Sequence, residues 1–237
     1  MILYSIGDGY TSGCCTANQY LYASDDKKYF GMHHVEHPDN RPGSFINPIG
    51  EIYKAPVMIV GCHRKTLEEM IGELDSYKAQ IKEINQEVIA FIGIPDLRSI
   101  FSIEHKQLEN LFGKGSEGMY NSFLEKWLML DGMDIIDDND ADTYFEMCQL
   151  RDKVYEPHKK VYQLEQFIKE ISNITKQVIV YRTTHKESLK LNLPENVSFL
   201  NESIVDILAE NHEPYRKGYY DAEAYKTLRH NFLKLLR

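Results

Sequence analysis

The sequence lacks the features that mark disulfide-rich, membrane-spanning and secreted proteins. It has only four cysteines, and they form neither a CxxC pair nor a spaced disulfide framework, which is typical of a reducing compartment. No apolar run approaches the length of a membrane span. Met1 is followed directly by apolar residues, without the basic segment of a secretory signal. We therefore expect a soluble, cytoplasmic protein with free thiols.

Positive charge is also scarce. The chain has 27 Lys and Arg against 36 Asp and Glu, which gives a formal net charge of -9. A protein that binds duplex nucleic acid needs an excess of cations to displace counterions from the phosphates. We therefore expect no duplex nucleic acid as a partner, and the absence of a long apolar run likewise predicts no membrane partner.

Signatures of cofactor sites are missing as well. Gly7-Asp8-Gly9 lacks the third glycine of a dinucleotide fingerprint, and no Gly-Lys-Ser/Thr occurs. His33, His34 and His37 are spaced closely enough for a metal, but they lie in a stretch with no predicted helix or strand to fix them. The sequence predicts no cofactor and no metal site.

Short apolar runs are the main structural signal that is present. Runs of this length, bounded by glycine or proline, predict buried strands, and five of them occur at Ile2 to Ile6, Val57 to Val60, Glu87 to Ile94, Gln177 to Tyr181 and Val197 to Leu200. Between the second and third runs, apolar residues at intervals of three and four predict an amphipathic helix from Thr66 to Ile84. Thr66 and Glu69 have the spacing of a capping box.

Alternation of strand, helix and strand predicts right-handed parallel units. We therefore predict one doubly wound α/β domain over residues 1–237, with a mostly parallel, flavodoxin-like sheet of five strands between helices. Residues 101–176 are expected to form a helical insertion, and Asp221 to Arg237 a closing helix. Tyr10 to Pro56 has an irregular pattern, in which only Ala17 to Ala23 is predicted to be helical.

A candidate site follows from this architecture, because open parallel sheets bind ligands beyond the carboxyl ends of their strands. The residues that follow the first four predicted strands are Asp8, Gly9, Tyr10 and Ser12, then Gly61, Cys62 and His63, then Asp96 and Arg98, and finally Thr183, Thr184 and His185. Tyr10, Cys62, His63, Arg98 and His185 are the candidate ligand contacts.

Four short segments resemble the sequence blocks of the SGNH (GDSL-type) hydrolases. Ser5 to Gly13 resembles the opening block, in which a strand runs into Gly-Asp-Ser and the serine is the nucleophile. Val60-Gly61 resembles the block whose glycine amide binds the oxyanion, and Gly93 to Asp96 resembles the Gly-x-Asn-Asp block. Gly218 to Tyr225 resembles the terminal block, in which a histidine shortly precedes a helix. The resemblance implies an SGNH-type fold with family block positions at Asp8, Gly9, Gly61, Asp96 and Tyr219.

At three of the four catalytic positions in this alignment, the residue differs from the one that the family uses. The nucleophile position holds Gly9, which has no hydroxyl, and the asparagine position holds Pro95, which has neither a side-chain amide nor a backbone N–H. The histidine position holds Tyr219, a poor base at neutral pH because a phenol has a pKa of about 10. We therefore predict a protein that lacks the standard machinery and binds a ligand or partner in the crevice.

Two alternatives remain open. Ser12, Cys14 or Cys15, with a histidine such as His63, His185 or His212, would supply a rearranged nucleophile for an active ester or acyl hydrolase or an acyltransferase. The chain would otherwise be an unrelated α/β protein, for example a transferase. The sequence names neither the small molecule or protein partner nor the oligomeric state.

Overall fold

The computed structural model describes residues 1–8, 11, 44–61, 65–97, 149, 152–153, 155–183, 189–212 and 222–236. The chain divides into two compact units, Met1–Asp96 together with Lys159–Arg237, and Leu97–His158. The architecture below is that of the first unit. The second unit falls largely within the range predicted for the helical insertion, and the assignment of one domain to residues 1–237 stays a prediction.

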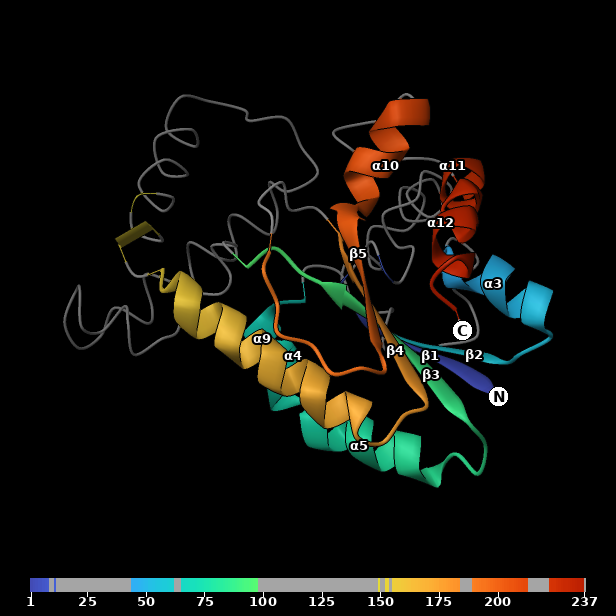
Figure 1. Ribbon diagram of the computed structural model, residues 1–237, viewed down its shortest axis with the longest axis horizontal. Coiled ribbons are helices and arrows are strands. Elements are labelled where there is room, and N and C mark those ends of the chain that lie inside the picture. Colours follow the sequence, from blue (N-terminus) through green and yellow to red (C-terminus); the bar gives the residue numbers. More distant parts are fainter. Residues whose placement is uncertain are drawn as a thin grey trace, which may run out of the picture. The chain divides into compact units, whose positions relative to one another are not determined.

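The first unit is built on one parallel sheet of five strands in the order β2-β1-β3-β4-β5 (Figure 1). The strands are β1 Ile2–Gly7, β2 Val57–Gly61, β3 Val88–Ile94, β4 Gln177–Arg182 and β5 Val197–Ser203. Every neighbouring pair is parallel. The predicted doubly wound α/β fold is confirmed, and β1, β2, β4 and β5 continue beyond the predicted carboxyl ends.

The strand register brings the predicted site segments to one edge of the sheet. Gly7 of β1 pairs with Gly61 of β2, and Ile6 pairs with Ile92 of β3. Ile94 pairs in turn with Arg182 of β4. Because parallel strands all end at the same edge, the chain leaves β1, β2, β3 and β4 from neighbouring points.

Three helices cover one face of the sheet, namely α4 Leu67–Gly72, α5 Leu74–Glu83 and α9 Pro157–Ser172 (Figure 1). The predicted capping box is present, since Thr66 accepts from the Glu69 amide and Glu69 accepts from the Thr66 amide. The single helix predicted from Thr66 to Ile84 is wrong, because the chain breaks at Glu73. The Glu73 carboxylate there accepts from Lys65 Nζ at 2.5 Å and from the Tyr77 hydroxyl at 2.6 Å.

Helices also cover the other face, and two of them were not predicted. α3 Ile46–Tyr53 lies in the segment expected to be irregular, where Pro48 is tolerated because it occupies the first turn and lacks only an N–H that has no intrahelical partner. α10 Ile204–Asn211 begins at Ser203, whose hydroxyl accepts from the Asp206 amide at 3.0 Å.

The predicted closing helix consists of two short helices, α11 Ala222–Thr227 and α12 Arg229–Leu233. The Leu228 amide donates to the Tyr225 carbonyl at 3.2 Å, so the chain makes a tighter turn between them. The helix predicted from Ala17 to Ala23 lies outside the described residues.

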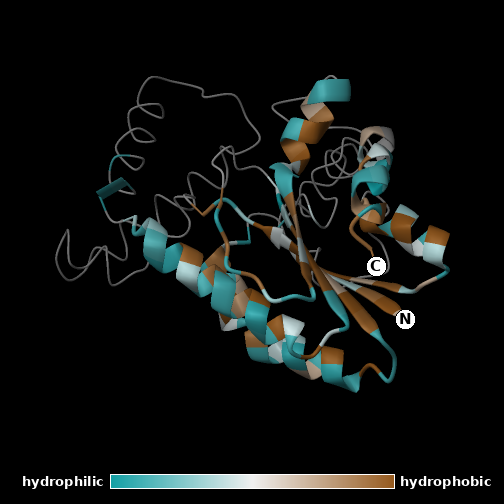
Figure 2. Ribbon diagram, in the orientation of Figure 1, coloured by the Kyte–Doolittle hydropathy of each residue, from teal (hydrophilic) through white to brown (hydrophobic). Residues whose placement is uncertain are grey.

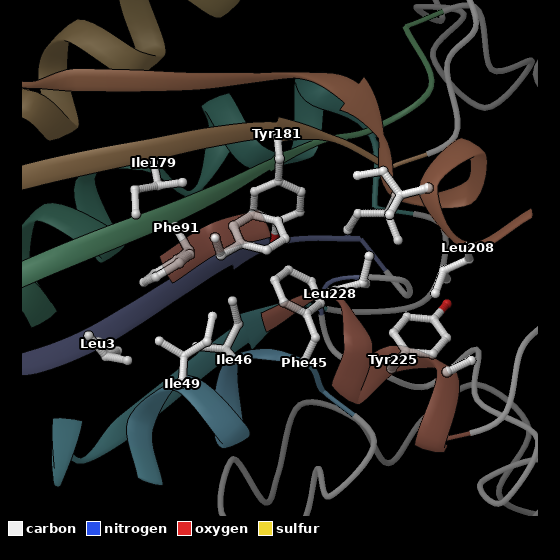
Figure 3. Close-up of a cluster of buried hydrophobic side chains, with 14 of the residues drawn as sticks. Leu3, Phe45, Ile46, Ile49, Phe91, Ile179, Tyr181, Leu208, Tyr225 and Leu228 are labelled. Carbon is white, nitrogen blue, oxygen red and sulfur yellow. The ribbon is translucent and has the colours of Figure 1, made fainter. Parts of the chain in front are cut away.

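The core on the α3 side is aromatic. Phe45 stacks on Phe232 with ring centroids 4.5 Å apart and meets the edge of Tyr181 at 5.3 Å. Figure 3 shows Phe45 and Tyr181 together with other buried apolar side chains of this cluster between α3, the C-terminal helices and the sheet. The strands are largely apolar, whereas α5 and α9 carry hydrophilic residues along their length (Figure 2). Within the described ranges, no helix has the length and apolar character needed to cross a membrane.

Candidate functional site

Asp8 lies at the end of β1 and is 7% exposed. One carboxylate oxygen, Oδ2, accepts from Thr183 Oγ1 at 2.7 Å. The other, Oδ1, accepts from the Thr11 amide at 3.3 Å and from Thr11 Oγ1 at 3.4 Å. Burial of a carboxylate is costly unless its oxygens receive hydrogen bonds. These contacts account for how Asp8 is tolerated at the tip of the strand.

Thr11 is seated directly over two glycines of neighbouring strands. A Cβ added to Gly7 would lie 2.2 Å from Thr11 Oγ1, and a Cβ added to Gly93 would lie 2.1 Å from the same atom. Both distances are far below a permitted contact, so only glycine fits at either position while Thr11 is in place. The glycine of the Gly93 to Asp96 segment therefore has a packing reason that is independent of catalysis.

The hydroxyl of Tyr181 extends this network to β4. It donates to Thr11 Oγ1 at 3.0 Å and is fully buried. Burial raises the pKa of Tyr181 well above its usual value, and the nearby Asp8 raises the pKa further. The phenol therefore stays protonated and acts as a donor throughout the physiological pH range.

Ser44 connects the same turn to α3. Its hydroxyl donates to the Thr11 carbonyl at 2.8 Å and accepts from the Ile46 amide at 3.4 Å, at the start of that helix. Thr11 is thus held through its amide, its hydroxyl and its carbonyl. Asp8 and Thr11 are therefore held by hydrogen bonds with Thr183, Tyr181 and Ser44.

Gly61, Pro95 and Asp96 lie at the ends of the two strands that flank β1. Gly61 is the last residue of β2 and pairs with Gly7. Pro95 is buried directly after β3, and Asp96 next to it is exposed. The structure thus places Asp8, Gly61 and Asp96 at adjacent strand ends, as the topology predicts. Their assignment to a catalytic or binding role stays a prediction.

His212 follows the last residue of α10, and its Nε2 lies 3.3 Å from Thr227 Oγ1. The remaining predicted site residues lie outside the described residues, and they are Gly9, Tyr10, Ser12, Cys14, Cys15, Cys62, His63, Arg98, Thr184, His185 and Tyr219. In the part of the chain that the structure describes, no group of three His, Cys, Asp or Glu side chains is arranged to hold a metal ion.

Sequence reasoning missed Thr11, Ser44 and Tyr181 as parts of the site. Thr11 sits inside the segment that resembles the opening block of the SGNH hydrolases, and Tyr181 ends a predicted strand. For Thr11 and Tyr181, the only sequence signal of a role in the site was this position near a strand end. Their contacts join segments 33 to 170 residues apart in the sequence, which no local pattern reveals.

A hollow of about 190 Å³ lies at the opposite edge of the sheet. Its lining includes Lys176, Gln177 and Asn196, near the starts of β4 and β5. Gln177 donates to the Leu235 carbonyl at 2.7 Å, and Asn196 to the Ser172 carbonyl at 2.9 Å. These amides serve the structure, and the hollow is remote from the strand ends at which parallel sheets bind ligands.

Comparison with known proteins gives matches only among solved structures. No protein-family model and no curated protein sequence matches the chain. A catalytic mutant of an acetylxylan esterase from Geobacillus stearothermophilus is similar, with a TM-score of 0.50 and 12% identity, covering 98% of this chain and 92% of that one. The fold is that of the SGNH-type hydrolases.

A second solved structure is also similar to this chain. It is a putative lipolytic protein of the G-D-S-L family from Desulfitobacterium hafniense, with a TM-score of 0.41 and 13% identity, and the match covers 99% of this chain and 98% of that one. At such identities the similarity concerns the fold alone. The resemblance inferred from the sequence blocks is confirmed at the level of the SGNH-type fold, which says nothing of activity.

Proposed function

We propose that this chain is a non-hydrolytic protein of SGNH-type fold that binds a ligand or partner at the carboxyl edge of its sheet. The observation that carries the proposal is Pro95, which is buried directly after β3 at the position where the family has asparagine. A tetrahedral oxyanion needs donors aimed at it. Proline offers neither a side-chain amide nor a backbone N–H there.

Asp8 supports the same conclusion. Both of its carboxylate oxygens accept hydrogen bonds from threonines of the protein, so its role is to hold the turn after β1. The position that follows, which carries the nucleophile in the family, is Gly9. A site of this fold whose nucleophile, asparagine and histidine positions carry Gly9, Pro95 and Tyr219 fits binding better than hydrolysis.

An ester or acyl hydrolase, or an acyltransferase, with a rearranged nucleophile is the second candidate. Ser12 directly follows Thr11, whose amide, hydroxyl and carbonyl are all held at the tip of β1. Cys14 and Cys15 follow two and three residues later. A thiolate would also serve as the nucleophile if a histidine lay beside it.

Chemical labelling separates the two candidates. We expect that neither a fluorophosphonate nor a thiol-directed activity probe will label a nucleophile in the unmodified protein, and that the protein will not hydrolyse p-nitrophenyl acetate above background. An active esterase of SGNH-type fold, assayed in parallel, serves as the positive control. Hydrolysis by the unmodified protein that Ser12→Ala or Cys15→Ala abolishes would overturn the proposal and establish the rearranged enzyme.

Restoring the missing groups tests the alignment itself. Gly9→Ser or Tyr219→His alone should remain inactive, because the loss of triad members in serine hydrolases costs about four to six orders of magnitude in rate. The double variant should gain measurable esterase activity. Adding Pro95→Asn should raise that rate by a further factor of about 10²–10³, the usual effect of one oxyanion donor. A triple variant without activity would mean that the block assignment is wrong.

A further inference from the structure

Tyr181, near the end of β4, and Thr183, directly after it, make separate hydrogen bonds with residues that follow β1. Thr183 is fully buried and donates to Asp8 Oδ2 at 2.7 Å. Tyr181 lies two residues earlier and donates to Thr11 Oγ1 at 3.0 Å. The two contacts span 175 and 170 residues of sequence. They meet in the same short segment, because Thr11 is itself bonded to Asp8.

Thr183 has one hydroxyl proton and two acceptors within reach. Its Oγ1 lies 2.7 Å from Asp8 Oδ2 and 3.0 Å from the Ile94 carbonyl. That carbonyl already accepts the Thr183 amide at 3.3 Å. A hydrogen bond to an ionised acceptor is shorter and stronger than one to a neutral acceptor. The proton therefore belongs on the contact with Asp8, and the carbonyl is satisfied by the backbone.

The hydrogen bond from Tyr181 to Thr11 uses the phenol hydroxyl, whereas the ring makes the packing contacts. The ring meets Phe45 and Phe232 edge-on, with centroids 5.3 Å and 5.1 Å away, and those contacts hold it in the core. Replacing the phenol by a phenyl group would keep the packing and remove one donor. The two hydrogen bonds can therefore be removed separately by near-isosteric changes.

We infer that Thr183 and Tyr181 are positioning residues for the candidate site, and that together they fix Asp8 and Thr11, which follow β1, relative to the end of β4. The inference rests on the proposed function only in taking this edge of the sheet as the binding site. Thr183 acts through Asp8, and Tyr181 acts through Thr11. Neither residue is assigned a contact with the ligand.

Hydrogen exchange followed by mass spectrometry on the full-length, unliganded protein tests the coupling. The reporter is the Thr11 amide, which donates to Asp8. In Thr183→Val we expect exchange in peptides covering residues 8–11 to rise about tenfold or more, as the loss of a charge-assisted hydrogen bond implies. Thr183→Ser should restore protection. Tyr181→Phe should give a smaller rise, and the double variant more than the product of both.

Thr175→Val is the matched control. Thr175 Oγ1 donates to the Ile171 carbonyl at 3.0 Å, near the other end of β4. This variant should leave exchange at residues 8–11 unchanged. Unaltered exchange at residues 8–11 in both Thr183→Val and the double variant would overturn the inference. A uniform rise through the strand peptides would also overturn it, because it would show general destabilisation in place of a local tie.

The two proposals fail on different results. Exchange is measured without substrate, so an unchanged Thr11 amide would remove the tie and leave the proposal of a non-hydrolytic protein intact. Esterase activity in the unmodified protein would remove that proposal and leave the exchange result intact.

Discussion

Replacing Gly93 by alanine tests how tightly Thr11 is seated. The new Cβ would lie 2.1 Å from Thr11 Oγ1 and 3.1 Å from both Cε2 and the hydroxyl of Tyr181. The first distance is about 0.9 Å below the limit of real Cβ contacts. Thr11 cannot retreat easily, since Asp8 and Ser44 hold its amide and carbonyl, and every residue of β3 is buried.

Overpacking of this kind costs about 1–3 kcal/mol in protein cores. The size of the overlap places Gly93→Ala near the upper value, which corresponds to a fall in the melting temperature of roughly 6–12 °C for a chain of this length. Urea denaturation followed by circular dichroism measures the free energy of unfolding directly. A variant as stable as the unmodified protein would refute the reasoning.

The double variant Gly93→Ala with Thr11→Ala makes the test specific. Thr11→Ala removes the oxygen at 2.1 Å, so Gly93→Ala should cost less in this background than in the unmodified protein, while the 3.1 Å contacts with Tyr181 remain. Gly7→Ala is the comparison, because its Cβ would also lie 2.8 Å from the Thr11 Cβ, which alanine retains. That change should stay destabilising in both backgrounds. Additive costs for Gly93 and Thr11 would contradict the seating.

Two further predictions concern stability. Lys54 ends α3 at φ 51° and ψ 38° and is exposed, so Lys54→Gly should stabilise the protein by about 0.5–1 kcal/mol in thermal unfolding, whereas Lys82→Gly in the last turn of α5 should destabilise it. Burial raises the pKa of Glu73, but hydrogen bonds from Lys65 and Tyr77 outweigh this and lower it overall. The stability that Glu73 contributes is therefore present above its unfolded pKa of about 4.3 and lost as the pH falls through the lower folded value. Lys65→Met should destabilise at pH 7 and less at pH 3, and an equal loss at both values would exclude the ion pair as the cause.

The strands were predictable because their signal is local. Each is an apolar run that ends at or near glycine, proline or a polar turn, and in a parallel sheet both faces of such a run are buried. β3 is buried at all seven positions. The Thr66 capping box was predictable for the same reason, since its partners are three residues apart.

The sequence failed to predict the helix α3 and the helix break at Glu73 for opposite reasons. In α3 the punctuation by Pro48 and Gly50 suggested an irregular segment, yet proline is harmless in a first turn, and Gly50 is buried against Val57. At Glu73 the apolar periodicity continues through the break. The break is accompanied by an ion pair with Lys65 eight residues away and a hydrogen bond from Tyr77, and neither contact has a periodic signature.

The sequence by itself determined the α/β class, the parallel order of strand and helix, and which residues stand at the block positions, because propensity, periodicity and residue identity are properties of short segments. Only the tertiary structure decided that Asp8 is an internal anchor and that Gly7 and Gly93 make room for Thr11. Asp8 is bonded to Thr183, 175 residues further along the chain, and Thr11 is bonded to Tyr181, 170 residues further along. Contacts at such separations exist only after the strands have paired.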